Sequence, residues 1–169
     1  MKKNVHFKHN IPDVIKSNER YPQIWADVST AKVQMAISFL QRVIEDRTPQ
    51  GAGPINMKTR YYGKVASYGY KTTGHIGTPV HYFWPVEYGA KPHPVSKEGF
   101  ERIQQWVNVK LGVSDIKESR RIAMGIIRRI GDVGVEPQYF AKDAVEDNLY
   151  YVIEILNQIP DEIIKQLSA

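Results

Sequence analysis

One stretch decides the fold, and it reads PQIWADVSTAKVQMAISFLQRVIED over residues 22–46. Its apolar residues recur every three or four positions and make two adjacent stripes: Ile24, Val28, Ala31, Met35 and Phe39, then Val33, Ile37, Leu40 and Ile44. The two stripes together make a wide apolar face, which predicts a long, well-buried helix. Pro22 fits the first turn of that helix, because the first turn does not use the N–H that proline lacks.

The residues before this helix show no apolar period. Asn10-Ile11-Pro12-Asp13 has the composition of a turn, and we expect residues 1–18 to form an extended N-terminal arm. After the helix, the stretch TPQGAGP over residues 48–54 cannot continue it. A chain of 169 residues fits one domain better than two. We therefore expect residues 19–169 to form a single domain.

Residues 55–90 favour a sheet. Aromatic and β-branched residues fit a pleated surface, and this region is crowded with them: Tyr61, Tyr62, Val65, Tyr68, Tyr70, Tyr82, Phe83 and Trp84. Glycines at positions 63, 69, 74 and 77 divide the region into short strands and hairpins. The pattern predicts an antiparallel β-meander.

Three helices are expected after the sheet, each with turn or capping residues at its ends. The first is expected from about Lys97 to Leu111, with Gly112 directly after it. The second is expected to begin with a cap at Ser114 and to end at Gly131 and Gly134, and the third to run from about Pro137 to Pro160. The predicted fold class is α+β, with a long N-terminal helix, an antiparallel β-meander and three C-terminal helices packed on the sheet.

Charge is distributed unevenly along the chain. The formal net charge is +5. Residues 1–131 hold 21 basic and 10 acidic side chains, whereas residues 132–169 hold 2 basic and 8 acidic ones. Three interpretations are open. The basic part binds nucleic acid, the acidic end of one copy meets the basic body of the next, or both parts are simply solvated.

Metal and thiol chemistry has little support in the sequence. The chain has no cysteine, which excludes disulfides and thiolate metal sites. Its histidines, at positions 6, 9, 75, 81 and 93, include no His-x-x-x-His pair. Strands could bring His75, His81 and Glu87 together as a three-ligand site, but ordinary exposed or hydrogen-bonded histidines are the better interpretation. We predict no metal and no cofactor.

Catalytic patterns are equally scarce. There is no Gly-x-Ser-x-Gly nucleophile turn, and Gly51-Ala-Gly-Pro54 lacks the lysine and following helix of a phosphate-binding loop. Glu87 is the only carboxylate residue between positions 55 and 95. An enzyme would therefore need a pocket in which His81, Glu87 and His93 converge, and we predict a protein without catalytic residues. No run of apolar residues is long enough for a membrane span.

Nucleic-acid binding remains the main alternative function. Two arginine pairs, Arg120/Arg121 and Arg128/Arg129, lie two helical turns apart and so fall on one side of a helix, where they could meet phosphates. Tyrosines of the predicted sheet could stack on single-stranded bases. The same arginines also occupy positions where an amphipathic helix needs polar residues.

Two segments resemble a known family. The first is Val86-Glu-Tyr-Gly-Ala90 followed by Pro92-His-Pro94, and the second runs from Ala123 through Ile126, Ile127, Ile130 and Gly134 to Pro137-Gln-Tyr-Phe140 and Ala144. Together with the order of the predicted elements, they resemble the tail-completion, or head–tail joining (neck), proteins of long-tailed bacteriophages. This chain has Ala90 where that family usually has threonine.

The resemblance implies a structural role without catalysis. It implies a ring of identical copies, commonly a hexamer, that completes the tail tube and joins it to the head connector or stopper protein. The protein would be made in the host cytoplasm and end in the virion, with DNA passing through the ring and no membrane contact. Our candidate assembly residues are Glu87, Tyr88, Gly89, Pro92, His93, Arg120, Arg121, Arg128 and Arg129.

Overall fold

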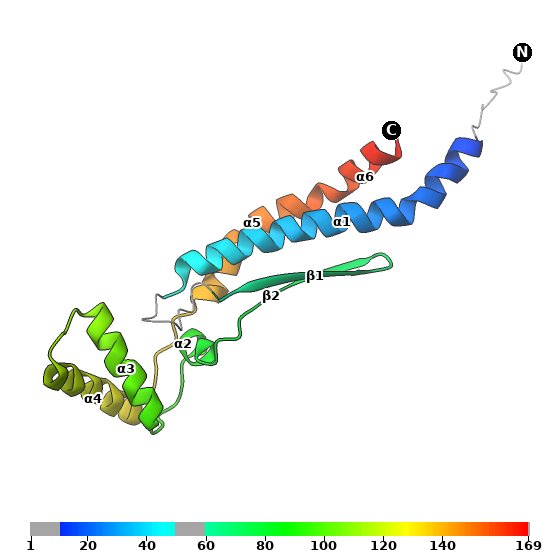
Figure 1. Cartoon of the computed structure of the whole chain (residues 1–169). Helices are drawn as coiled ribbons and strands as arrows, with labels where there is room; N and C mark the ends of the chain where they lie inside the picture. Colours follow the sequence, from blue (N-terminus) through cyan, green and yellow to red (C-terminus); the bar gives the residue numbers. More distant parts are fainter. Residues whose placement is uncertain (1–10, 50–59, 169) are drawn as a thin grey trace, which may run out of the picture.

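The computed structural model describes residues 11–49 and 60–168 (Figure 1). The described elements, in chain order, are α1 (Ile11–Arg47), β1 (Tyr62–Tyr68), β2 (Lys71–Gly77), α2 (Phe83–Tyr88), α3 (Lys97–Lys110), α4 (Ile116–Val133), α5 (Phe140–Asn157) and α6 (Ile159–Leu167). The predicted mixture of a long N-terminal helix, an antiparallel sheet and C-terminal helices is confirmed.

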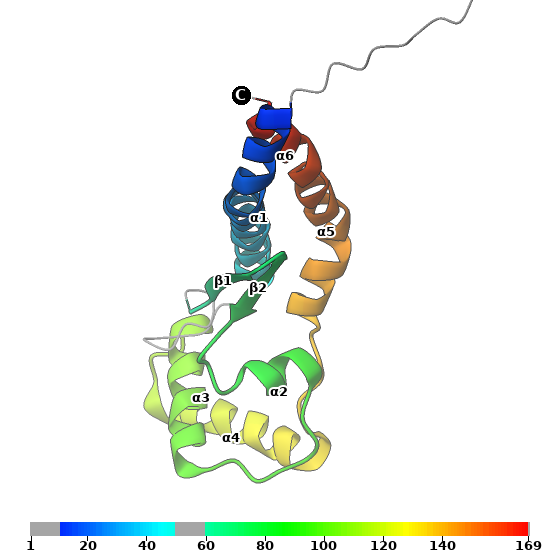
Figure 2. The same cartoon turned by 90° about the vertical axis from the view of Figure 1, so that its right-hand side faces the viewer.

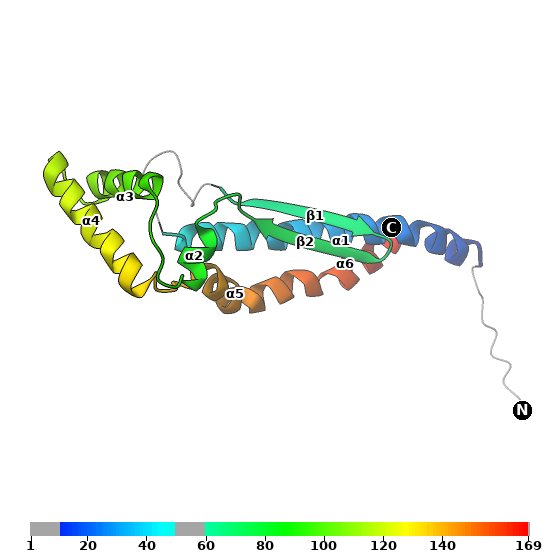
Figure 3. The same cartoon turned by 90° about the horizontal axis from the view of Figure 1, so that it is seen from below.

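The molecule is elongated, and α1 is its axis. The β1–β2 hairpin lies along one side of α1, while α5 and α6 run back along another side (Figures 1 and 3). Helices α3 and α4 pack on each other as a separate helical hairpin beyond one end of α1, and α2 lies between this hairpin and the rest (Figure 2). The prediction that the C-terminal helices pack on the sheet is therefore wrong for α3 and α4, and α1 is the helix that covers the hairpin.

The hairpin approaches α1 closely because two of its inward positions are glycines. β1 and β2 pair antiparallel from Tyr62 opposite Gly77 to Tyr68 opposite Lys71. A Cβ atom at Gly63 or Gly74 would lie 2.5 Å from a side-chain carbon of Ile37 in α1. The absence of side chains at both positions lets the strand backbones rest directly on the helix.

Two buried clusters connect α1 to the C-terminal helices. The larger cluster joins the end of α1 to the start of α5 and comprises Ile44, Tyr61, Val80, Phe140 and Ala144. The smaller cluster joins the other part of α1 to α6 and comprises Ile24, Val28 and Ile163. Because the middle and the C-terminal end of α1 are packed on partners far away in the sequence, these contacts hold the α1–α5–α6 bundle together.

Tyr61 is the polar member of the larger cluster. Its phenol oxygen lies 2.9 Å from the Thr48 hydroxyl, which in turn donates to the Ile44 carbonyl. Burial raises the pKa of the Tyr61 phenol above its ordinary value of 10.0, and the negative charges of Glu87 and Glu45 act in the same direction. The hydrogen bond with Thr48 opposes this shift.

The first helix is longer than the sequence predicted. It begins at Ile11 and continues through Pro22, so residues 11–18 are helical where an extended arm was expected; residues 1–10 lie outside the described residues. Pro12 takes the early position that we assigned to Pro22. The predicted stripes are also partly wrong, because Ala31 and Met35 are exposed while Ala36 is buried.

The predicted β-meander is also wrong in part. The described residues contain one sheet of two strands, and Phe83 and Trp84 belong to α2 instead of a strand. The helix tolerates Pro85 because this residue lies in the first turn, where its missing N–H is not needed. Helical spacing turns Phe83 and Val86 toward the core formed with Phe140, and this packing favours a helix over the strand that the aromatic run predicted.

Several helix ends differ from their predicted positions. Asp115, not Ser114, caps α4, because its side chain accepts a hydrogen bond from the Glu118 N–H at 2.7 Å. Helix α4 continues through Gly131 and ends at Gly134. The last predicted helix starts at Phe140 and is followed directly by α6. Gly112, with a φ of +66°, follows α3 as predicted.

Candidate functional site

Glu87 joins α2 to the start of α5. Its side chain is only 1% exposed, and its two carboxylate oxygens accept hydrogen bonds from the backbone N–H groups of Ala141 (3.0 Å) and Lys142 (2.8 Å). These are first-turn N–H groups of α5 and have no partner within the helix. A carboxylate at this position also interacts favourably with the helix dipole, so Glu87 caps α5 from a different element.

Backbone contacts strengthen the same connection. The Gln138 N–H donates to the Val86 carbonyl and the Tyr139 N–H donates to the Glu87 carbonyl, both at 3.0 Å. Tyr139 has a φ of +48°, a left-handed conformation that is costly for a residue with a side chain. The hydrogen bonds on both sides of Tyr139 fix this turn at the entry to α5.

Two glycines allow the segment after α2 to contact the segment after α4. Ala90 and Val135 form an antiparallel bridge, with N–O distances of 3.0 and 2.8 Å. Gly89 and Gly134 flank this bridge with φ of +77° and +91°. A Cβ atom at Gly134 would lie 2.0 Å from the Ala90 carbonyl oxygen, and one at Gly89 would lie 2.7 Å from the Val135 carbonyl oxygen.

Residues 86–90 and 134–142 thus form one unit, which we call the α2–α5 junction. It contains most of the first segment on which the family resemblance rests and the latter part of the second. Glu87 and Gly89, which we predicted as assembly residues, lie inside this junction, where they connect parts of the fold. The buried Glu87 carboxylate is engaged by α5 and is not presented to a partner.

An exposed aromatic patch lies over the junction. Trp84 is 64% exposed and Tyr88 is 53% exposed, and their rings stack with centroids 5.5 Å apart. Tyr139 meets the Tyr88 ring edge-on at 6.2 Å. Tyr88 is therefore the member of the predicted turn that reaches the surface, and its two aromatic neighbours, Trp84 and Tyr139, were not among the predicted assembly residues.

The proline-rich loop after the junction is exposed. Pro92 and His93 both lie on the surface, and the His93 Nδ1 atom lies 2.8 Å from the Lys91 carbonyl oxygen. Within the described residues, this contact with Lys91 is the only hydrogen bond of the His93 imidazole. The loop connects the junction to α3.

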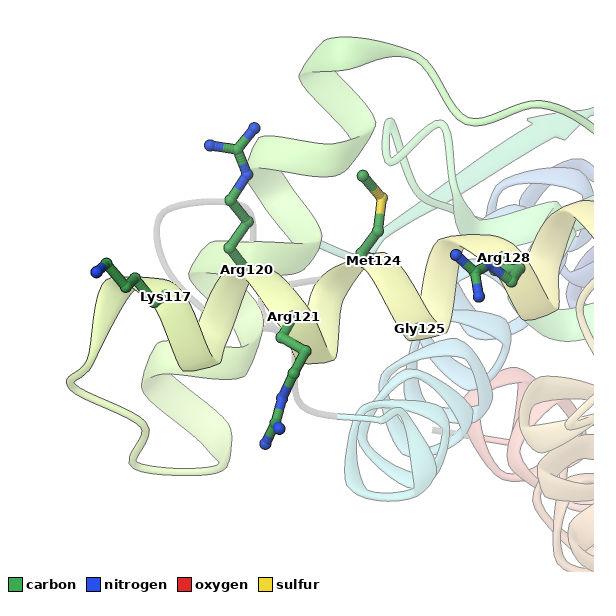
Figure 4. Close-up of a pocket in the computed structure, with 6 residues that line it drawn as sticks. All are labelled: Lys117, Arg120, Arg121, Met124, Gly125 and Arg128. Atoms are coloured by element: carbon green, nitrogen blue, oxygen red, sulfur yellow. The ribbon is translucent and has the colours of Figure 1, made fainter.

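The outward side of α4 is strongly basic. A pocket on α4 is lined by the six residues that Figure 4 labels, namely Lys117, Arg120, Arg121, Met124, Gly125 and Arg128. We call these six residues the α4 basic face. The structure brings Arg120, Arg121 and Arg128 to this face together, but places Arg129 outside it, in an ion pair with Glu136 at 2.9 Å.

The cations of this face differ in their intramolecular partners. Arg121 lies 3.8 Å from Glu118, and Arg120 lies over the Phe100 ring at 5.9 Å. Arg128 and Lys117 make no ion pair or hydrogen bond with any side chain in the described residues. The face is therefore mostly unneutralised within the chain and attracts anionic groups.

A second surface feature was missed at the sequence level. Val145, Leu149 and Ile153 form an apolar line on the solvent side of α5, with exposed fractions of 37%, 51% and 46%; we call it the α5 stripe. The spacing of four residues was the available signal, since it marks a helical face separate from the one that carries Phe140 and Ala144.

The described residues hold no three-ligand group of His, Asp or Glu that could bind a metal ion, so His75, His81 and Glu87 are not brought together. His81 lines a small surface hollow with Arg60 and Arg102, whereas Glu87 is directed to α5 and His93 lies on the exposed loop. None of the helices in the described part of the chain has the length and apolar character that a membrane span needs.

No protein-family model matches the chain, and neither a curated protein nor a solved structure is significantly similar to it.

Proposed function

We propose that this chain is a structural protein of a bacteriophage tail or neck, which forms a ring of its own copies that completes the tail tube and joins it to the head connector. The observation that carries the proposal is the α2–α5 junction. Two short segments resemble the family, and although more than fifty positions separate Glu87 from Lys142, they meet in one hydrogen-bonded unit. Segments that act as one unit make a more specific resemblance than two unrelated matches.

Two surface properties support a role in assembly. The aromatic patch of Trp84, Tyr88 and Tyr139 is exposed over the junction, and Trp and Tyr are the residues most enriched at the energetic centres of protein interfaces. The molecule is elongated (Figure 1), with much of its length formed by α1, α5 and α6 and few buried residues. Such a shape favours burial of further surface between copies.

Binding to tail tubes tests this function. The purified full-length chain is incubated with isolated tail tubes that lack their head-proximal end proteins, and the mixture is imaged by negative-stain electron microscopy. We expect added density at one end of each tube. A Trp84→Ala variant, which removes a patch residue outside residues 86–90 and 134–142 and leaves the hydrogen bonds of the junction in place, is expected to reduce the capped fraction at least about tenfold. Tubes that stay bare in the presence of the wild-type chain contradict the proposal.

The α4 basic face favours one alternative, a nucleic-acid-binding protein. Three of the four predicted arginines lie on that face, and phosphate contacts of this kind weaken steeply as salt rises. Changing Arg120, Arg121, Arg128 and Arg129 to glutamine tests whether these side chains carry a DNA affinity, and the oligomeric state of the wild type separates the two functions. Loss of a salt-dependent DNA affinity, with ring formation absent in the wild type, favours the alternative.

A further inference from the structure

The two oppositely charged parts of the chain lie apart in the elongated molecule. Helix α4 carries five basic and two acidic residues, whereas α5 and α6 together carry six acidic and two basic ones. Figure 1 shows α4 in the helical hairpin at one end, while α5 and α6 extend along α1 toward the other end. No ion pair joins α4 to α5 or α6 within the described residues, so the charges do not neutralise each other inside one chain.

The α4 basic face combines charge with a small apolar centre. Lys117, Arg121 and Arg128 follow one line along the helix, since their spacings of four and seven residues return to the same side. Met124 lies between them and is exposed, and Gly125 beside it leaves the helix backbone open. A helix of another molecule can therefore approach α4 closely at this point.

The α5 stripe has the complementary composition. Val145, Leu149 and Ile153 supply an exposed apolar line, and helical spacing places a row of carboxylates beside it, from Asp143 through Glu146 to Glu154. These acidic residues are all exposed. Apolar surface of this kind on a helix is normally covered by another element.

The two faces also match in length. From Lys117 to Arg128 and from Asp143 to Glu154 the chain advances by the same number of positions, about 16 Å at the rise of an α-helix. One chain cannot bring its own α4 and α5 together, because the two helices lie in different parts of the fold (Figure 2). A second copy of the same chain carries the complementary face.

We propose that the α4 basic face of one copy docks on the α5 stripe and its carboxylate row in the next copy. The inference rests on the proposed ring and names the surfaces that would build it. Met124 would pack on the apolar stripe, where burial supplies affinity, while the charged rows would set partner orientation and association rate. The contact joins different surfaces of two identical chains, so its repetition produces a closed ring or a filament.

Complementary charge reversal tests this interface. The first full-length variant is Arg121→Glu with Arg128→Glu, and the second is Glu146→Arg with Glu154→Arg. Each variant alone presents two faces of like charge, so we expect its half-assembly concentration, measured by analytical ultracentrifugation in about 0.1 M salt, to rise at least about tenfold above that of the wild type. In an equimolar mixture every contact of an alternating assembly pairs opposite charges again, and we expect wild-type sedimentation to return.

A matched control for the first variant carries Arg42→Glu with Lys71→Glu, which lowers the net charge by the same amount at exposed positions outside both faces. We expect it to assemble as the wild type does, and thermal unfolding checks that all variants are folded. Assembly of either face variant at wild-type concentrations, or a mixture that fails to recover, overturns this interface while the wild-type ring still stands. A wild-type chain that stays monomeric overturns the proposed function together with the interface.

Discussion

Glu87 connects two elements that are 54 positions apart in the chain, and its replacement measures what this connection contributes. In Glu87→Gln the amide keeps one acceptor oxygen but turns an N–H₂ group toward a backbone N–H, and the negative charge at the start of α5 is lost. We expect the free energy of unfolding to fall by about 1–3 kcal/mol, measured by urea denaturation. Glu136→Gln is the control, because that exposed carboxylate takes part only in a surface ion pair and its loss costs at most about 1 kcal/mol.

Tyr61 gives the fold a sensitivity to alkaline pH. The pKa of its phenol is raised in the folded state, first by burial and further by Glu87 and Glu45. Above the ordinary pKa of 10.0 the unfolded chain releases this proton while the folded chain retains it, so stability falls as pH rises. The stabilisation that comes from the protonated Tyr61 phenol is fully present below pH 10.0 and is lost as pH increases toward the folded-state pKa.

Tyr61→Phe isolates this effect. We expect the unfolding free energy of the wild type to decrease more steeply than that of the variant when pH is raised from about 9 to about 11. Tyr150, whose pKa is also raised through its hydrogen bond to Glu154, is present in both proteins and cancels in the comparison. Parallel pH profiles for the two proteins would contradict a buried, proton-retaining Tyr61.

At the scale of single elements, two glycines near the end of α4, Gly131 and Gly134, differ in backbone conformation and in their role. Gly134 ends α4 with φ +91° and ψ −159°, a combination that only glycine adopts readily, and an added Cβ would collide with the Ala90 carbonyl oxygen. Gly131 lies within α4 with nothing near its Cβ position. We expect Gly134→Ala to lower the unfolding free energy by more than about 2 kcal/mol.

Gly131→Ala is the matched comparison, because we expect it to change stability in the opposite direction. Gly131→Ala is expected to raise the unfolding free energy by about 0.5–1 kcal/mol, since alanine reduces the entropy of the unfolded chain and favours the helix. Thermal and urea unfolding of both variants measure the difference. Equal effects of the two substitutions would show that the α2–α5 junction does not depend on the Gly134 conformation.

The sequence predicted those elements whose signals are local. Helices α3 and α4 have apolar repeats with capping residues close to their ends, and these signals placed their starts within two residues. The helical state of Phe83 and Trp84 was not predictable in this way, because it depends on packing against Phe140, which is distant in the chain. An aromatic run alone favours a strand, and tertiary contacts reverse that preference here.

The same distinction applies to the candidate site. The exposure of Arg120, Arg121 and Arg128 followed from the amphipathic pattern of α4. The burial of Glu87 did not, because its partners are backbone groups of α5 that no sequence pattern marks. Sequence reasoning therefore assigned Glu87 to an exterior contact, whereas the structure uses its carboxylate for an internal one.

At the scale of the whole molecule, the separation of charge predicts a response to salt. If α4 of one copy meets α5 of the next, screening of the two charged rows weakens association as the Debye length falls from about 10 Å at 0.1 M salt to about 3 Å at 1 M. We expect the mean mass from light scattering to decrease over this range. A mass that does not change with salt would indicate that the charged rows contribute nothing to assembly.

Direct imaging of the purified full-length chain tests the central claim, that this protein works as a ring of its own copies. Negative-stain electron microscopy in about 0.1 M salt, where the charged faces are only partly screened, shows the assembled form without any partner. The expected result is closed rings of uniform diameter with a central opening and a single rotational symmetry. A field of elongated single molecules, or of open filaments that never close, would contradict it.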